Sequence, residues 1–405
     1  MKIKLNKLFT TTALACSCFT FGQEMLPQQQ DTSLFKQEII FSGRANYAGT
    51  SLLNEMSSAL LEGGELSQDI KNRSFAQHRV KNIFGADISG EISYLNYNPT
   101  NIGKGKYGIK IIAGAYSYLS ASYRKDAFGL AFYGTNLYKG KTADFSDTDL
   151  NSYRMQKLGI GLVDKVSKSS VNLNYYSISN YSQLSIARGT LAINEDASES
   201  VLDLGGSYLV MDDKGFNKGF GVGLDADFRL KVEWIKESTA FFQLQAKNIG
   251  FMSLKNLSAY AVDSSFSFSG FSLFNSASLD SSYVDSLGLY SENVDKRMVL
   301  PGFIQFGKMI DEHSTLTIQS YFGIRLYTRL NYNPLVFAGW QYRASKKIKI
   351  GAQASYGGFA HLRCGIYTQY DFGKFHLGLG TEDLIGGLSK KGKGESIFLR
   401  ISARW

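Results

Sequence analysis

The sequence predicts an all-β fold, a transmembrane antiparallel β-barrel of about 14 strands (about 12 to 16) that follows an N-terminal helical segment. Three observations support this fold class: long runs of alternating polarity, a composition suited to strands, and an export leader. Among the 405 residues are 41 Gly, 24 Tyr and 28 Phe but only 4 Pro. Glycine and aromatic residues at this density favour strands that pack side chains on both faces.

The clearest alternation runs from Gly219 to Trp234. Every even position in it is apolar, and every odd position is glycine or a charged residue. A period of two over this length indicates a strand with one apolar and one polar face. Similar alternation recurs at 201–210, 315–326, 347–356 and 397–405. Tilted strands of about ten residues are what a membrane barrel requires.

Charged side chains on the polar faces distinguish a barrel from a soluble sandwich, whose dry core would make them costly. Eight of these residues are predicted to line the lumen: Asp225, Asp227, Arg229, Lys231, Glu233, Arg325, Arg363 and Glu382. One interpretation is structural, with opposite charges bonding across strands and holding the shape of the barrel. The other is a selectivity lining for a polar solute.

One hairpin gives a specific pairing. A tight turn at Asp371-Phe372-Gly373-Lys374, with Gly373 as the second loop residue, would place Arg363 directly opposite Glu382. Both residues also fall on the lumen side by alternation. The pair would then be a cross-strand ion pair on the polar face.

The first 22 residues are predicted to be a signal peptide. Lys2, Lys4 and Lys7 precede an apolar run, 8–21, that ends before Gly22; this run is shorter than the roughly 20 residues a membrane helix needs. An alternative is lipidation at Cys16. The sequence motif for lipidation usually has leucine three residues before the cysteine, where this chain has Ala13. Cleavage would leave Cys364 as the single cysteine, on the lipid face and with no disulfide partner.

The segment 23–80 is predicted to be helical, because Leu52, Leu53, Met56 and Leu60 have helical spacing. It is interpreted as a helix packed at the mouth of the barrel, or else as a plug or a periplasmic cap. The barrel itself is placed at 81–405. A serine-rich insertion at 253–298 is expected to hold partly ordered structure outside the membrane.

Several short motifs resemble those of an uncharacterised outer-membrane β-barrel family of Bacteroidota, known as a domain of unknown function. They are 60–64 (LLEGG), 69–71 (DIK), 82–85 (NIFG), 248–251 (NIGF) and 355–359 (SYGGF). The architecture is more distantly similar to fatty-acid-transporter barrels and to barrels associated with type IX secretion. The resemblance implies the barrel fold and the outer membrane as location, and it implies no activity.

Catalytic and metal-binding patterns are not found in the sequence. Of the 4 His, His361 and His376 fall on predicted lumen faces but would lie roughly 25 Å apart at about 3.3 Å per residue. No Cys/His spacing suggests a metal, and we expect no cofactor and no enzymatic activity. The net charge of +9 is spread along the chain, so we expect no nucleic-acid partner.

The function predicted from these observations is a structural or accessory barrel of an envelope secretion or surface-assembly system in the outer membrane. Its expected partners are outer-membrane lipid and other envelope proteins. The alternative is a channel or transporter for small polar or lipidic solutes.

Overall fold

The computed structural model describes residues 35–62, 64–98, 105–211, 216, 218–235, 238–269, 290–310, 316–328 and 331–405. Within them, 14 antiparallel strands form a closed ring, as the sequence predicted. The ring closes where β1 pairs with β17, from Glu38 opposite Arg404 to Ala48 opposite Gly394. The first and last strands of the barrel are therefore neighbours.

The strands follow one another around the ring in chain order. They are β1 (Gln37–Gly49), β2 (Lys81–Asn96), β3 (Tyr107–Arg124), β5 (Thr148–Asp164), β6 (Ser170–Ile193), β8 (Gly219–Ile235), β9 (Ser238–Ser269), β11 (Phe303–Met309), β12 (Ile318–Tyr327), β13 (Asn333–Arg343), β14 (Ile348–Gly358), β15 (Ala360–Asp371), β16 (Phe375–Thr381) and β17 (Gly394–Arg404). Three further segments, β4 (Lys141–Asp144), β7 (Glu199–Val210) and β10 (Tyr290–Val299), continue the lines of β5, β8 and β11 beyond the ring.

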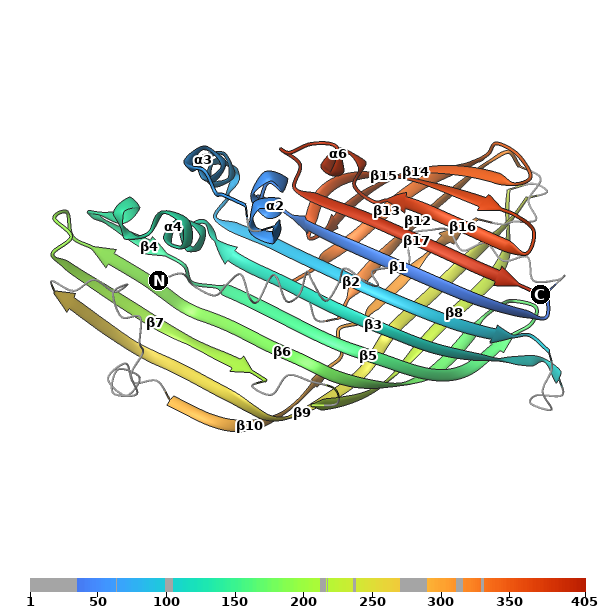
Figure 1. The fold of residues 1–405 in the computed structure, drawn as a ribbon, viewed down its shortest axis with the longest axis horizontal. Coiled ribbons are helices and arrows are strands. Elements are labelled where there is room, and N and C mark those ends of the chain that lie inside the picture. Colours follow the sequence, from blue (N-terminus) through green and yellow to red (C-terminus); the bar gives the residue numbers. More distant parts are fainter. Residues whose placement is uncertain are drawn as a thin grey trace.

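The wall of the barrel is much taller on one side. β6 has 24 residues and β9 has 32, whereas β11 and β16 have 7 each. The long strands, together with β4, β7 and β10, form a surface extension that projects away from the end holding the C-terminus (Figure 1). The connections that contain helices or extra strands also lie at this far end. In outer-membrane barrels the extracellular loops are long and the periplasmic turns are short, so the far end corresponds to the extracellular side.

Helices lie at the far end of the barrel (Figure 1). They are α2 (Asn54–Glu62), α3 (Gln68–Gln77), α4 (Lys125–Tyr133), the 3-10 turn η2 (Thr135–Tyr138) and the short α6 (Leu384–Gly387). Because α2 and α3 connect β1 to β2 at that end, they do not cap the end that holds the C-terminus.

The barrel was expected to begin at residue 81, but its first strand, β1, lies before that residue. The segment 23–80 contains β1, whose outward side chains include Ile39 and Phe41 while Glu38, Ser42 and Arg44 point inward. In the serine-rich stretch, residues 253–269 continue β9 and 290–298 belong to β10. The predicted signal peptide lies outside the described residues.

Side chains alternate between the outer and the inner face of the barrel along each strand, as predicted. On β8, Val222, Leu224 and Leu230 are 52%, 50% and 66% exposed, whereas Asp225 and Asp227 are 4% and 8% exposed. Apolar side chains are likewise exposed on the outside of β12 to β17. A closed sheet with an apolar exterior satisfies its backbone hydrogen bonds in lipid. The protein is an outer-membrane β-barrel of porin-like architecture.

No helix in the described ranges is both long and apolar enough to cross a membrane.

The interior contains several clusters of buried apolar side chains. Towards the far end, an upper apolar layer gathers tyrosine, methionine and leucine side chains, among them Tyr153, Met155, Met252 and Leu300. Phe359 packs its ring directly onto the backbone of Gly85, where a Cβ would clash with it. A smaller lower layer contains Ile40, Leu95, Tyr97 and Val163.

Replacing Leu224 by arginine should weaken folding into lipid vesicles, because a charge on the lipid face near the midplane costs about 2–4 kcal/mol. Leu224→Met, close in size and polarity, is the matched control and should fold like the wild type. The measurement is the free energy of unfolding in a denaturant titration. Equal values for the two variants would show that the assigned lipid face is wrong.

The rim of the far end contains a buried histidine. His78 follows α3, contacts the Ser74 carbonyl oxygen through Nδ1 (2.7 Å) and lies 3.0 Å from the Tyr123 hydroxyl through Nε2. Its ring packs 4.1 Å from that of Phe128 on α4. Burial lowers the pKa of His78 from 6.5 to about 4, opposed by the hydrogen bond to Ser74 and assisted by the charge of Lys125.

The rim should therefore loosen in mild acid. Because the folded state disfavours the charged imidazole, the unfolded segment binds the proton more readily between pH 6.5 and 4, and stability is lost as the pH falls through this window. Hydrogen-exchange protection of α3 should decrease from pH 7 to pH 4. His78→Gln should abolish that dependence; an unchanged profile in this variant would refute the role of His78.

Candidate functional site: an ion network in the lumen

A buried lysine joins three strands on one side of the lumen. Lys157 on β5 donates from Nζ to Glu91 Oε2 on β2 and to Asp225 Oδ2 on β8, each at 2.9 Å. Tyr116 on β3 donates its hydroxyl proton to the same Glu91 oxygen at 2.7 Å. The Lys157 side chain is fully buried, so its charge is compensated by these two carboxylates. We call Lys157, Glu91 and Asp225, with Tyr116 and Lys247, the lysine cluster.

A β-bulge on β9 shapes this cluster. The β8–β9 register shifts between Leu224 and Ala226, and Asn248 has φ +54°, a conformation that asparagine tolerates better than most residues. The backbone N–H of Asn248 donates to Asp225 Oδ1 at 2.8 Å. The bulge thus gives Asp225 a second donor, in the way that bulges re-aim groups near functional sites.

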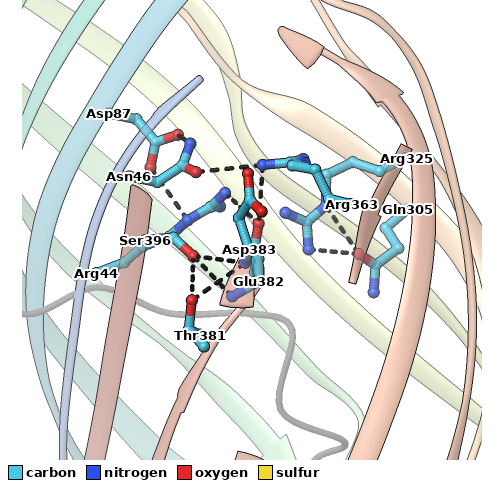
Figure 2. Close-up of polar contacts among 10 residues, drawn as sticks. All are labelled: Arg44, Asn46, Asp87, Gln305, Arg325, Arg363, Thr381, Glu382, Asp383 and Ser396. Carbon is cyan, nitrogen blue, oxygen red and sulfur yellow. Dashed lines mark hydrogen bonds and ion pairs between the residues drawn. The ribbon is translucent and has the colours of Figure 1, made fainter. Parts of the chain in front are cut away.

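A second group of buried charges contains Arg44, Asp87, Arg325, Arg363 and Glu382, and we call it the arginine cluster (Figure 2). Arg44 on β1 contacts Glu382 Oε2 at 3.0 Å and Asp87 Oδ1 at 3.3 Å. Arg363 on β15 donates to Asn46 Oδ1 at 3.2 Å and lies 3.7 Å from the same Glu382 oxygen. Two guanidinium groups therefore converge on one buried carboxylate.

A second arginine–amide contact extends the arginine cluster along the wall. Arg325 on β12 donates from Nε and Nη2 to Gln305 Oε1 on β11 at 2.8 and 2.6 Å. Its guanidinium also lies 4.7 Å from the centre of the Phe303 ring, a cation–π geometry. The side chain is completely buried.

The predicted pairing of Arg363 with Glu382 needs a correction. β15 and β16 pair Asp371 with His376, so the two-residue turn is Gly373-Lys374, one residue later than expected, with Gly373 at φ +84° in the first loop position. The register therefore differs by two residues, and β16 ends at Thr381, before Glu382.

Glu382 reaches Arg363 by leaving the strand. Its backbone N–H donates to Ser396 Oγ at 2.7 Å, and that of Asp383 donates to the same oxygen at 3.2 Å. The Asp383 side chain caps α6 by accepting from the N–H of Gly386 at 2.7 Å. These contacts hold the carboxylate of Glu382 in the lumen. Arg363 and Glu382 thus lie close together, as predicted, but through the chain that follows β16 and not through cross-strand pairing.

Opposite walls of the barrel meet in the interior. Lys247 on β9 lies 3.5 Å from Glu91 on β2, and four strands of the 14-strand ring, β3, β5, β6 and β8, lie between β2 and β9 by the shorter way round. A cavity of about 30 Å³ is lined by Arg44, Asp87 and Glu91 from one wall and by Lys247, Phe303 and Tyr327 from the other. Space of this size holds little more than water, so the described side chains of the two walls leave little room between them in this cavity.

The chain is similar to several solved structures at low sequence identity. No family model and no curated protein matches the chain. Among solved structures it is similar to a TodX deltaS2S3 mutant monoaromatic hydrocarbon channel, with a TM-score of 0.46, 9% identity and coverage of 92% of this chain and 91% of that one. It is also similar to the toluene transporter TbuX of Ralstonia pickettii, with a TM-score of 0.43, 10% identity and coverage of 92% of this chain and 90% of that one. For the translocator domain of the autotransporter NalP from Neisseria meningitidis the TM-score is 0.29, with 8% identity and coverage of 99% of this chain and 95% of that one.

The residues predicted from sequence fall into three groups. Asp225 belongs to the lysine cluster, and Arg325, Arg363 and Glu382 to the arginine cluster. Asp227 and Arg229 form a separate pair at 2.8 Å, with Gln243 donating to Asp227 at 2.7 Å. Lys231 is exposed, and the side chain of Glu233 lies outside the described part of the chain.

The residues that connect these groups were not predicted from the sequence. Asp87 and Glu91 alternate on β2 with the outward Ile88 and Ile92, so the signal was present in the sequence. Lys157 follows two inward apolar residues, Tyr153 and Met155, so its strand does not show a consistently polar face.

Three of the four histidines lie in the described part of the chain. His376 is buried on β16, whereas His361 on β15 is exposed and lies against Tyr356. His313 lies outside the described residues. Among the described side chains, no group of three or more His, Cys, Asp or Glu is placed to hold a metal ion. The ion network can bind charge and hold the walls together.

Lys157→Met should destabilise the barrel by about 3–5 kcal/mol, because removing one partner leaves buried carboxylates without compensation. The triple variant Lys157→Met/Glu91→Gln/Asp225→Asn should recover most of this loss, since it removes the whole charge group. Lys231→Met, an exposed lysine on β8, is the control, with an expected change within about 0.5 kcal/mol. The measurement is unfolding in lipid vesicles; equal losses for Lys157→Met and Lys231→Met would contradict the role of the cluster.

Proposed function

We propose that the protein is a sealed outer-membrane barrel that serves as a structural or accessory component of an envelope secretion or surface-assembly system. The observation that carries this proposal is the contact between opposite walls, in which Lys247 meets Glu91 across the lumen. A passive channel needs a continuous water-filled path, whereas here the charged side chains bond to one another. Such charges stabilise the shape of the barrel.

The surface extension supports an accessory role. Residues of β6, β7 and β9 beyond the ring pair with one another over 182–193, 199–210 and 258–269. A transport path through the ring does not require a sheet of this height. An exposed sheet outside the membrane offers backbone and side-chain surface to another envelope protein. Membership in the Bacteroidota family that the sequence motifs resemble is part of this proposal.

The second candidate is a transporter for lipidic solutes. The observation that favours it is the upper apolar layer, whose methionine and tyrosine side chains include Met155, Met252 and Tyr153. Flexible methionine side chains adapt to apolar ligands. In this alternative, the side chains that join the walls would have to separate for the solute to pass.

Planar-bilayer recording distinguishes the two candidates. The wild-type protein should give no stable conductance, because its lumen is filled. A variant with Glu91, Lys157 and Lys247 all replaced by alanine should conduct more, and Lys231→Ala should remain silent. Heat-modifiable migration on gels confirms that each barrel is folded. Stable conductance of the wild type would overturn the sealed barrel, and failure of any envelope protein to copurify with the folded wild type would count against the accessory role.

A further inference from the structure

A second small cavity in the lumen, of about 40 Å³, has an excess of positive charge. Its basic lining residues are Lys110, Lys168, Arg229, Lys247 and Arg400. Its acidic lining residues are Glu91, Asp225 and Asp227. Five cations and three carboxylates leave two positive charges in excess at the cavity wall.

The three carboxylates are already bonded to other cations. Lys157, which lies behind the cavity wall, contacts both Glu91 and Asp225 at 2.9 Å. Asp227 is paired with Arg229 at 2.8 Å. The acidic residues therefore leave little negative charge for Lys110 and Arg400.

Of the other lining cations, Lys247 lies 3.5 Å from Glu91, and Lys168 lies 4.6 Å from the centre of the Tyr97 ring. Arg400 and Lys110 are the two that remain. The Arg400 side chain is 7% exposed, and its guanidinium has no hydrogen bond or ion pair with any described side chain. Glu38, whose charge acts on Arg400 from a distance, is held by Arg404 at 3.0 Å. Lys110 donates to the Ser170 hydroxyl at 3.4 Å, a long contact with a neutral group. A buried cation without a counter-charge is costly.

From this arrangement we infer that the cavity binds one small anionic group, a halide, carboxylate or phosphate, between Arg400 and Lys110. An oxyanion matches the donors of a guanidinium, which bind it in pairs, and an ammonium adds a point charge. The volume admits the anionic group itself and no larger body. The source of the group is a free ion or the head group of an amphiphile. The inference does not rest on the proposed accessory function, because it concerns the charge of the interior alone.

The test is the thermal unfolding midpoint of the full-length protein in a non-ionic detergent. Sodium gluconate at constant ionic strength is the baseline, and sodium chloride, sodium phosphate or sodium decanoate replaces part of it. We expect the midpoint to rise with the concentration of at least one of these anions. A rise with chloride or phosphate identifies a free ion, and a rise with decanoate alone identifies a head group.

Variants locate the effect. Arg400→Gln should weaken the apparent affinity for the anion about tenfold, and Lys110→Gln should weaken it as well. Arg400→Lys keeps the charge and should retain part of the affinity. Lys346→Gln removes an equal charge at an exposed turn and should bind like the wild type. Midpoints that are the same in gluconate and in all three anions, or an undiminished response in Arg400→Gln, would overturn the proposal.

Discussion

In the hydrocarbon region of a membrane no water is present to bond the backbone, so each strand of a spanning sheet needs a neighbour on both sides. The pairing of β1 with β17 meets this requirement, because it joins the two ends of the ring. Once the ring is closed, the alternation of side chains along every strand sorts them into a lipid face and an interior face. The apolar exterior and the polar interior both follow from this single constraint.

The interior then faces a second requirement. Parity places charged residues inside, and the walls approach so closely that little water remains beside them. Buried charges are therefore stabilised by opposite charges, as Lys157 is by Glu91 and Asp225, and as Arg44 is by Glu382. Breaking such a pair is costly even where forming it gives little net stabilisation. The network thus specifies how the walls meet.

Alternation was sufficient to predict the fold class, a range that includes the observed strand number, and the inward direction of Asp225, Arg325 and Arg363. Glu382 points inward because the chain leaves the strand after Thr381. The same rule applied to residues 37–49 would have identified β1, since Ile40 is the one apolar residue among the inward positions 38, 40, 42, 44 and 46. The segment 23–80 was instead predicted to be helical, because Leu52, Leu53, Met56 and Leu60 further along it have helical spacing.

Cross-lumen contacts were beyond the reach of the sequence. Parity gives the face on which a side chain lies, but not which residue on the opposite wall it meets. The meeting of Lys247 with Glu91 depends on the bulge at Asn248 and on the shape of the closed ring. The hairpin at Gly373 shows a related limit, because moving a turn by one residue changes every pairing of the register.

The claim that the lumen is sealed is tested most directly by thiol labelling from one side of the membrane. Ser93 lines the cavity of about 40 Å³ and is 5% exposed. On β2 it follows Glu91, so it lies on the C-terminal side of the contact between Glu91 and Lys247. In a Cys364→Ser background, Ser93→Cys is compared with Ser198→Cys, which lies at an exposed turn of the surface extension. A small charged methanethiosulfonate reagent is added to the side of reconstituted vesicles that the surface extension faces. The sealed barrel predicts rapid modification at position 198 and none at position 93 over the same time, whereas equal rates at the two positions would contradict it.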